Sequence, residues 1–98
     1  MENEQKNEQK NQYVAKYTAR IEQWEAELDK LKARAAEATA DARLKLQREI
    51  GDLQAKTADQ RRKLDEIRHA GGEAWADLRT GFERAWDDVQ SAWARMKE

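Results

Sequence analysis

Residue types that carry catalytic chemistry are scarce in this chain. It contains one histidine, His69, a single serine, Ser91, and no cysteine, so a nucleophile paired with a general base has few possible members. The sequence also lacks a glycine-rich phosphate loop, the HExxH spacing of zinc proteases and the CxxC spacing of dithiol sites. We therefore expect no enzymatic activity, no catalytic residues, no bound cofactor and no metal site.

Two other features have simple structural interpretations. Asp87 and Asp88 are adjacent carboxylates, but neighbouring side chains on a helix point about 100° apart and do not converge on one ion. His69 lies next to a pair of glycines, where a partly positive imidazole suits the C-terminus of a helix. We expect a solvated acidic face and a helix-terminal histidine.

The tryptophans stand above this background. Trp75, Trp86 and Trp93 each follow an alanine and precede an apolar residue by three positions. We favour a core role, in which the rings fill a helical seam and the indole N–H groups reach its rim. The alternative is a docking face for another protein or for an apolar surface, since tryptophan is enriched where proteins bind their partners.

The spacing of apolar residues places these rings on helices. From Tyr13 onward, apolar or small residues recur in alternating steps of three and four, which is the heptad pattern of a coiled coil. The pattern slips after Ala42 and then resumes, and we favour a continuous helix because no proline or glycine lies at the slip. Thr57 and Gln60 also fall on the seam, where polar side chains help to select a register. The predicted seam and interface residues of this segment are Tyr17, Ile21, Trp24, Leu28, Leu31, Leu46, Ile50, Leu53, Leu64 and Ile67.

Gly71 and Gly72 mark the clearest turn. Glycine just past the last periodic residue is the usual left-handed end of a helix. A second seam follows the turn at the same spacing and consists of Trp75, Leu78, Phe82, Trp86, Val89 and Trp93. The sequence therefore predicts an all-α fold, a helical hairpin with a long coiled-coil helix over 13–70, a turn at 71–72 and a shorter helix over 73–97. Residues 13–98 form one domain, and residues 1–12 form a polar tail, either disordered or a frayed helix.

The lengths of these helices predict self-association. The last helix is too short to cover the apolar stripe from Val14 to Leu31 as well as the seam beside the turn, and soluble proteins avoid exposing such a stripe. A homo-oligomer, most simply a dimer, would cover it. The alternative is a monomeric three-helix bundle with a turn near 39–41 and helices over 13–38, 41–70 and 73–97. The similar helix lengths favour the bundle, and the lack of glycine or proline at its first turn argues against it.

The charge balance narrows the choice of partners. Charged residues make up 40% of the 98 residues, but 19 bases against 20 acids leave a net charge of −1. A chain without a basic face is a poor ligand for nucleic acid, so we expect none. An anionic membrane or lipid surface is less favoured for the same reason. The polar start of the chain, the absence of cysteine and the absence of an apolar run of about 20 residues predict a soluble, cytoplasmic protein.

Two segments carry a resemblance: YVAKYTARIEQWEAELDKLKARA at 13–35 and GGEAWADLRTGFERAWDDV at 71–89. With them the chain resembles a family of small bacterial coiled-coil proteins described as stress-response proteins, which have weak similarity to apolipoprotein-like helical repeats. The first segment is common to coiled coils, and the second, with two Ala-Trp units flanking Gly81, is more specific. The resemblance implies a helical protein associated with stress and no catalytic residues.

Two functions follow as hypotheses. The first is a non-enzymatic structural or protein-interaction coiled-coil protein, linked to stress response. The alternative is an amphipathic surface-coating protein, apolipoprotein-like or phasin-like, that binds lipid or apolar particle surfaces through its tryptophan-rich C-terminal helix.

Overall fold

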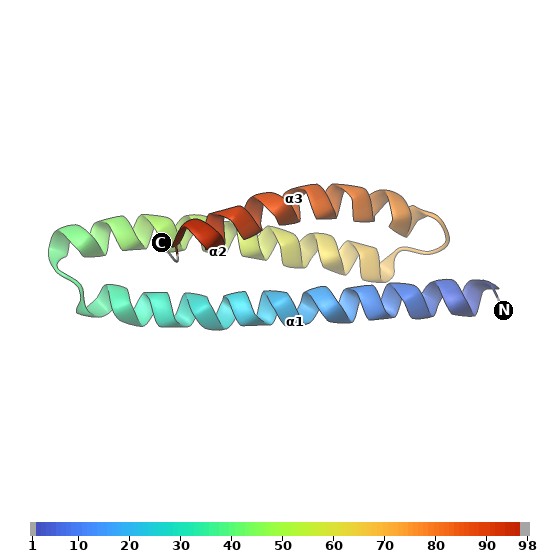
Figure 1. Cartoon of the computed structure of the whole chain (residues 1–98), viewed down its shortest axis with the longest axis horizontal. Coiled ribbons are helices and arrows are strands. Elements are labelled where there is room, and N and C mark those ends of the chain that lie inside the picture. Colours follow the sequence, from blue (N-terminus) through green and yellow to red (C-terminus); the bar gives the residue numbers. More distant parts are fainter. Residues whose placement is uncertain (1, 97–98) are drawn as a thin grey trace.

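Residues 2–96, the part of the chain that the computed structural model describes, form three helices joined by two turns (Figure 1). They are α1 (Glu2–Glu37), α2 (Ala40–His69) and α3 (Ala74–Met96). The predicted all-α class is confirmed. Residues 2–12, expected as a polar tail, belong to α1, while the outermost residues of the predicted tail and last helix, 1 and 97–98, lie outside the described part.

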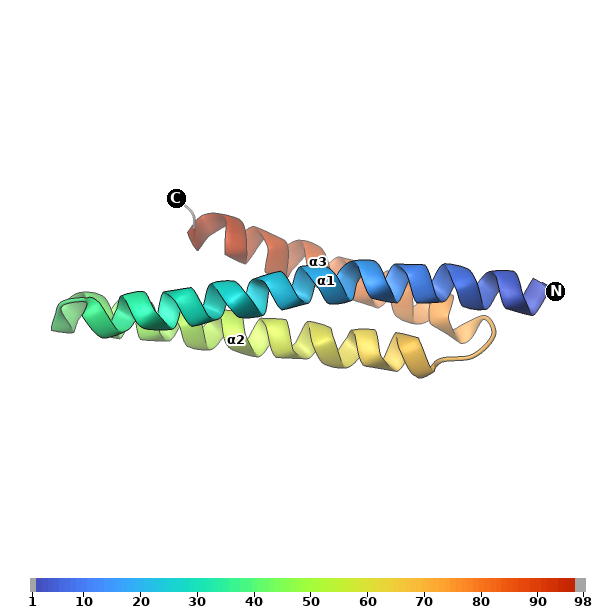
Figure 2. The same cartoon turned by 90° about the horizontal axis from the view of Figure 1, so that it is seen from below.

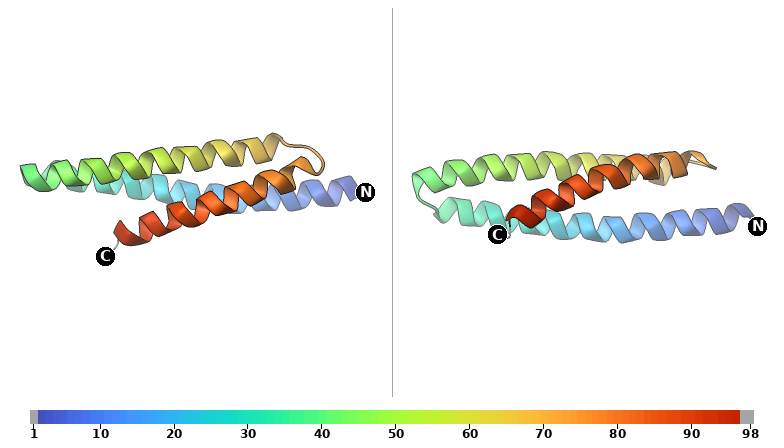
Figure 3. Two further views of the ribbon diagram at one scale, coloured as in Figure 1. Left: turned by 90° about the horizontal axis from the view of Figure 1, so that it is seen from above. Right: turned by 45° about the horizontal axis from the view of Figure 1, so that its top comes forward.

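The helices pack lengthwise into a rod with extents of 59 × 20 × 19 Å. α1 and α2 form an antiparallel hairpin, and α3 folds back along it, parallel to α1 (Figures 1 and 2). α3 runs at a slant and ends well short of the first turn, so the tip of the hairpin consists of α1 and α2 alone (Figure 3). This arrangement fits the alternative predicted from the sequence, a three-helix bundle with its first turn near 39–41.

The predicted two-helix hairpin is wrong in this detail, because its long helix is broken after Glu37. The backbone carbonyls in the last turn of a helix have no partner within the helix, so they need another donor. Arg43, in the first turns of α2, supplies it: its Nε donates to the carbonyl of Ala35 at 3.2 Å, and its Nη2 donates to those of Ala36 at 3.3 Å and Ala38 at 3.4 Å. A side chain therefore caps α1 where glycine was expected to be necessary.

The second turn contains Gly71 and Gly72. Gly72 has a φ of 59°, the only positive φ in the described chain, and this left-handed conformation favours glycine. Lys10 of α1 donates from Nζ to the carbonyl of Ala70 at 2.7 Å and thus caps the C-terminus of α2. The ring of His69 lies beside the same helix end, with Nδ1 2.9 Å from the carbonyl oxygen of Asp65.

One apolar core runs along the inner faces of the three helices. Its buried members are Val14, Ile21, Trp24, Leu28, Leu31, Ala35, Ile50, Leu53, Leu64, Ile67, Phe82, Trp86, Val89, Ala92 and Trp93. Among the predicted seam residues, Tyr17, Leu46, Trp75 and Leu78 are half-buried and pack against this core. The stripe from Val14 to Leu31, which was the reason to expect a dimer, is covered within a single chain.

Gln60 is the unusual member of the interior. Its side chain is 0% exposed, and neither its Nε2 nor its Oε1 has a hydrogen-bond partner among the described residues. The hydroxyl of Thr57, one turn earlier on α2, is buried in the same way. A buried polar atom without a partner costs about 1–3 kcal/mol.

Replacing Gln60 with leucine should therefore stabilise the bundle. We expect Gln60→Leu to raise the free energy of unfolding by about 1–2 kcal/mol, measured by urea denaturation, because an apolar side chain of similar size removes the unpaired amide. Gln90→Leu, on the exposed face of α3, is the matched control and should change stability by less than about 0.5 kcal/mol. Destabilisation by Gln60→Leu would show that the amide is satisfied in solution.

Candidate interaction surfaces

The aromatic side chains gather in one layer between α1 and α3. The chain has four tryptophans, two tyrosines and one phenylalanine. This aromatic layer consists of Tyr13, Tyr17, Trp24, Trp75, Phe82, Trp86 and Trp93, which makes it the complete set. Helix α1 supplies the first three rings and α3 supplies the other four.

Trp24 of α1 stacks on two tryptophans of α3. Its ring centroid lies 4.3 Å from that of Trp86 with 26° between the planes, and 6.0 Å from that of Trp93 with 13° between the planes. Tyr17 meets Trp86 edge-on, with centroids 4.6 Å apart and an interplanar angle of 79°. Stacked and edge-to-face pairs are the favoured geometries of aromatic rings. The three tryptophans are at most 8% exposed, so in this structure they serve as core and not as an outward docking face.

Polar groups close the rim of the aromatic layer. The guanidinium of Arg20 lies 5.8 Å from the ring centroid of Trp86, and that of Arg79 lies 5.0 Å from the ring centroid of Trp75. Such cation–π contacts contribute about 0.5–1 kcal/mol at exposed sites. The hydroxyl of Tyr13 donates to Oε1 of Glu83 at 3.1 Å, joining α1 to α3. Burial of the phenol, and then its hydrogen bond to Glu83, raises the pKa of Tyr13 well above its usual value.

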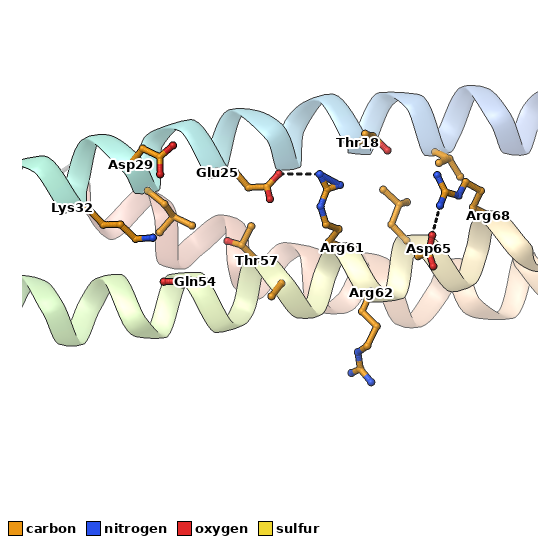
Figure 4. Close-up of a pocket in the computed structure, with 14 residues that line it drawn as sticks. Thr18, Glu25, Asp29, Lys32, Gln54, Thr57, Arg61, Arg62, Asp65 and Arg68 are labelled. Atoms are coloured by element: carbon orange, nitrogen blue, oxygen red, sulfur yellow. Dashed lines mark hydrogen bonds and ion pairs between the residues drawn. The ribbon is translucent and has the colours of Figure 1, made fainter.

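A groove lies between α1 and α2 and has a volume of about 710 Å³. Figure 4 shows this α1–α2 groove with α3 behind both helices. Val14, Leu28 and Leu64 contribute apolar side chains to its lining, while charged side chains of both helices border it. It extends along α1 from Val14 to Lys32, which is about 27 Å at 1.5 Å per residue.

The two borders of the groove differ in charge. The lining includes Glu25, Asp29 and Lys32 from α1, and Arg61, Arg62, Asp65 and Arg68 from α2. Acids therefore outnumber bases on the α1 border, and arginines outnumber acids on the α2 border. Arg61 reaches across to Glu25, with Nη2 3.1 Å from Oε1 (Figure 4). Among the described residues, this is the one ion pair that joins two helices, because the others link residues three or four apart on the same helix. Arg68 pairs instead with Asp65 on its own helix.

Two threonines line the groove. Thr18 is half-buried, whereas the hydroxyl of Thr57 is buried, and the lining contains no histidine that could act as a general base. Within residues 2–96, no cluster of three or more potential metal-ligating side chains is found. None of the described helices combines the length and the apolar character needed to cross a membrane.

Three residues with structural roles do not stand out in the sequence. Arg43 and Lys10 cap helix ends, and Ala92 lies buried between Val89 and Trp93. Ala92 could have been found from its position three residues after Val89, on the same face of the helix. Neither cap leaves a periodic signal, because each joins a side chain to a carbonyl in another helix.

Removing the indole ring of Trp24 should destabilise the bundle strongly. We expect Trp24→Ala to lower the free energy of unfolding by about 3–5 kcal/mol, because it leaves a cavity between two indoles. Trp75→Ala, at the half-buried edge of the layer, should cost less. Urea denaturation followed by far-ultraviolet circular dichroism measures both, and equal losses would contradict the larger contribution of the buried Trp24.

Stability should also fall at alkaline pH because of Tyr13. A raised pKa in the folded state means that the phenol contributes fully below its unfolded pKa of about 10 and that this contribution is lost as pH rises above it. Urea unfolding at about pH 8 and pH 11 should show a larger loss for the wild type than for Tyr13→Phe. An identical pH dependence of the two proteins would show that Tyr13 ionises freely in the folded state.

Comparison with family models, with curated proteins and with solved structures finds no significant match for this chain. The interaction surfaces therefore rest on the geometry described above.

Proposed function

We propose that this chain is a non-enzymatic structural protein that binds a protein partner through the α1–α2 groove. The single observation that carries the proposal is the charge bias across this groove, whose α1 border is mainly acidic apart from Lys32 and whose α2 border is mainly basic apart from Asp65. Cytoplasmic location and a role in stress response complete the proposal, and they are supported by the composition and the family resemblance of the sequence.

The shape of the groove fits a helix. Its length of about 27 Å corresponds to about five helical turns. A helix lying between α1 and α2 would complete a four-helix bundle, with its apolar stripe against Val14, Leu28 and Leu64. Its polar flanks would meet the acids of α1 on one side and the arginines of α2 on the other. The partner that fits is an amphipathic helix with basic residues along one flank and acidic residues along the other.

The ion pair between Glu25 and Arg61 can change partners at little cost. Both side chains are nearly half exposed, at 44% and 49%. Exposed pairs contribute about 0–1 kcal/mol, so exchanging this pair for two pairs with the partner leaves the bundle stable. The charges then select the orientation of the partner, which is the usual effect of complementary charges at an interface.

A charge exchange tests the proposal. The double variant Glu25→Arg/Arg61→Glu restores the ion pair within the chain but reverses the charges offered to a partner. We expect its stability to stay within about 1 kcal/mol of the wild type. A photo-crosslinking amino acid at Gln54, in the groove, should give a discrete product with a protein partner in cells, and the exchange should reduce it by about tenfold.

The control places the same crosslinker at Gln90, on the exposed face of α3 and away from the groove. This site should give no such product. A product of equal yield from both positions, or one that the charge exchange leaves unchanged, would contradict binding in the groove. A product with the mass of two copies of this chain would identify self-association instead.

The surface-coating function is a second candidate that one observation favours. The aromatic face of α3 meets the hairpin through side chains, and the short link at 70–73 lies outside both helices, so α3 could separate from the hairpin without breaking a helix. Quenching of tryptophan emission by vesicles of phosphatidylcholine with brominated acyl chains tests it. Strong quenching with co-flotation would favour a coat on lipid, and no quenching at high lipid concentration would exclude it.

A further inference from the structure

We propose that the turn between α1 and α2 is a hinge, and that two chains can exchange α1 through it to form a dimer. In this second arrangement, Ala38 and Thr39 become helical and α1 continues into α2. Each bundle is then built from α1 of one chain and from α2 and α3 of the other. The proposal concerns a second copy of this chain and does not depend on what binds in the groove.

The first observation is that the buried face keeps its helical phase across the turn. Ala35 at the end of α1 is buried, and Leu46 on α2 is half-buried against the core. These residues are separated by eleven positions, which is about three turns of a continuous helix. In a continuous helix, Ala38, which is half-buried here, and Ala42, which is exposed here, would fall on the same face between them. Opening the turn would therefore align the buried faces of both helices on one side of a longer helix.

The second observation is the chemistry of the turn itself. Only Ala38 and Thr39 separate the two helices, and the surrounding residues 33–42 are mostly alanine, the strongest helix former. The nearest glycine is Gly51, well inside α2. A short hinge that can itself become helical favours exchange of elements between copies.

The third observation is that the hydrogen bonds of the turn can be replaced by those of a helix. In the closed chain, the carbonyls of Ala35, Ala36 and Ala38 accept from the guanidinium of Arg43. In a continuous helix, the same carbonyls would accept from the backbone N–H groups four residues later. Arg43 therefore stabilises the closed turn without being needed in the open one.

The exchanged dimer leaves the rest of the structure unchanged. Every core contact is rebuilt between the two chains, including the stacking of Trp24 with Trp86 and Trp93. The new contact lies at the two-fold axis beside Ala38, where small side chains let the two long helices pass closely. The second turn keeps α3 folded back, because Gly72 holds a left-handed conformation and Lys10 caps Ala70.

A proline at position 40 separates the two arrangements. Ala40 is the first residue of α2, where proline is well tolerated, and Thr39 before it already has the extended conformation (φ −61°, ψ 163°) that precedes proline. In the long helix the same proline would lie in the interior and interrupt it in both copies. We expect Ala40→Pro to remain a folded monomer and to weaken dimerisation by at least about a hundredfold.

Removing the guanidinium of Arg43 should strengthen dimerisation. Arg43→Met keeps the aliphatic side chain but loses the guanidinium, so we expect about a tenfold gain in dimerisation. Gly72→Ala, which strains the second turn, is the control and should not raise the dimer fraction. Light scattering on a sizing column measures these fractions over a wide concentration range, after each protein is unfolded and refolded to allow exchange.

Cysteine crosslinking identifies exchange directly, because the chain has no cysteine of its own. Glu25→Cys/Arg61→Cys places a thiol on each helix at positions that form an ion pair in the closed bundle. A bis-maleimide, which spans the space left by the two long side chains, should link two chains in the dimer and a single chain in the monomer, with the Ala40→Pro background giving only the latter. Links confined to single chains in the Arg43→Met background at high concentration would overturn the proposal, as would a dimer fraction unaffected by Ala40→Pro.

Discussion

The stacking of Trp24 between Trp86 and Trp93 is the contact on which the arrangement of the three helices depends. It belongs to a layer that contains every aromatic ring of the chain, and this layer is what α1 and α3 share. Large flat rings bury much apolar area per residue, which lets a short α3 cover the α1 stripe that would otherwise face water. α2 meets α1 through smaller side chains, such as Ile50, Leu53 and Ala35. The bundle is therefore asymmetric, with bulky rings on one seam and aliphatic residues on the other.

Periodicity predicted the seam positions but not the break after Glu37. The seam positions and the turn at Gly71 and Gly72 follow from spacing and from glycine conformation, which are local properties of the sequence. The break after Glu37 depends on Arg43, whose guanidinium reaches back over five to eight residues to the last carbonyls of α1. The heptad pattern slips after Ala42, but Ala35 and Leu46 are still eleven residues apart, which is about three helical turns. The apolar pattern therefore fits a turn and a helix equally well. Helix lengths were the better guide, since they favoured the bundle that the structure shows.

The α1–α2 groove could not be predicted from the sequence, because it also depends on contacts between residues far apart in the chain. The α1–α2 groove and its ion pair depend on the register between two helices, which places Glu25 opposite Arg61 across 36 positions of sequence. Acids and bases are so frequent in this sequence that many different ion pairs between α1 and α2 are compatible with it. Only packing selects one, and Ile21, Leu28 and Leu64 fix that register by fitting into the core. Charge composition predicted a solvated surface, whereas the core decides which charges face each other.

The interior of the bundle combines stabilising aromatic contacts with destabilising unpaired polar atoms. The tryptophan stack favours one arrangement of the helices, while the unpaired amide of Gln60 lowers the stability of that same core. Ion pairs such as the one that lowers the pKa of Asp59, through hydrogen bonds with Arg62 and Lys63, act within single helices and would survive any rearrangement between helices. α1 and α2 are therefore stabilised by ion pairs of their own, whereas the core between the helices contains the unpaired polar atoms of Gln60. The proposed exchange of α1 between two chains requires stable single helices and a less stable core between them, because the helices must persist while their partners change.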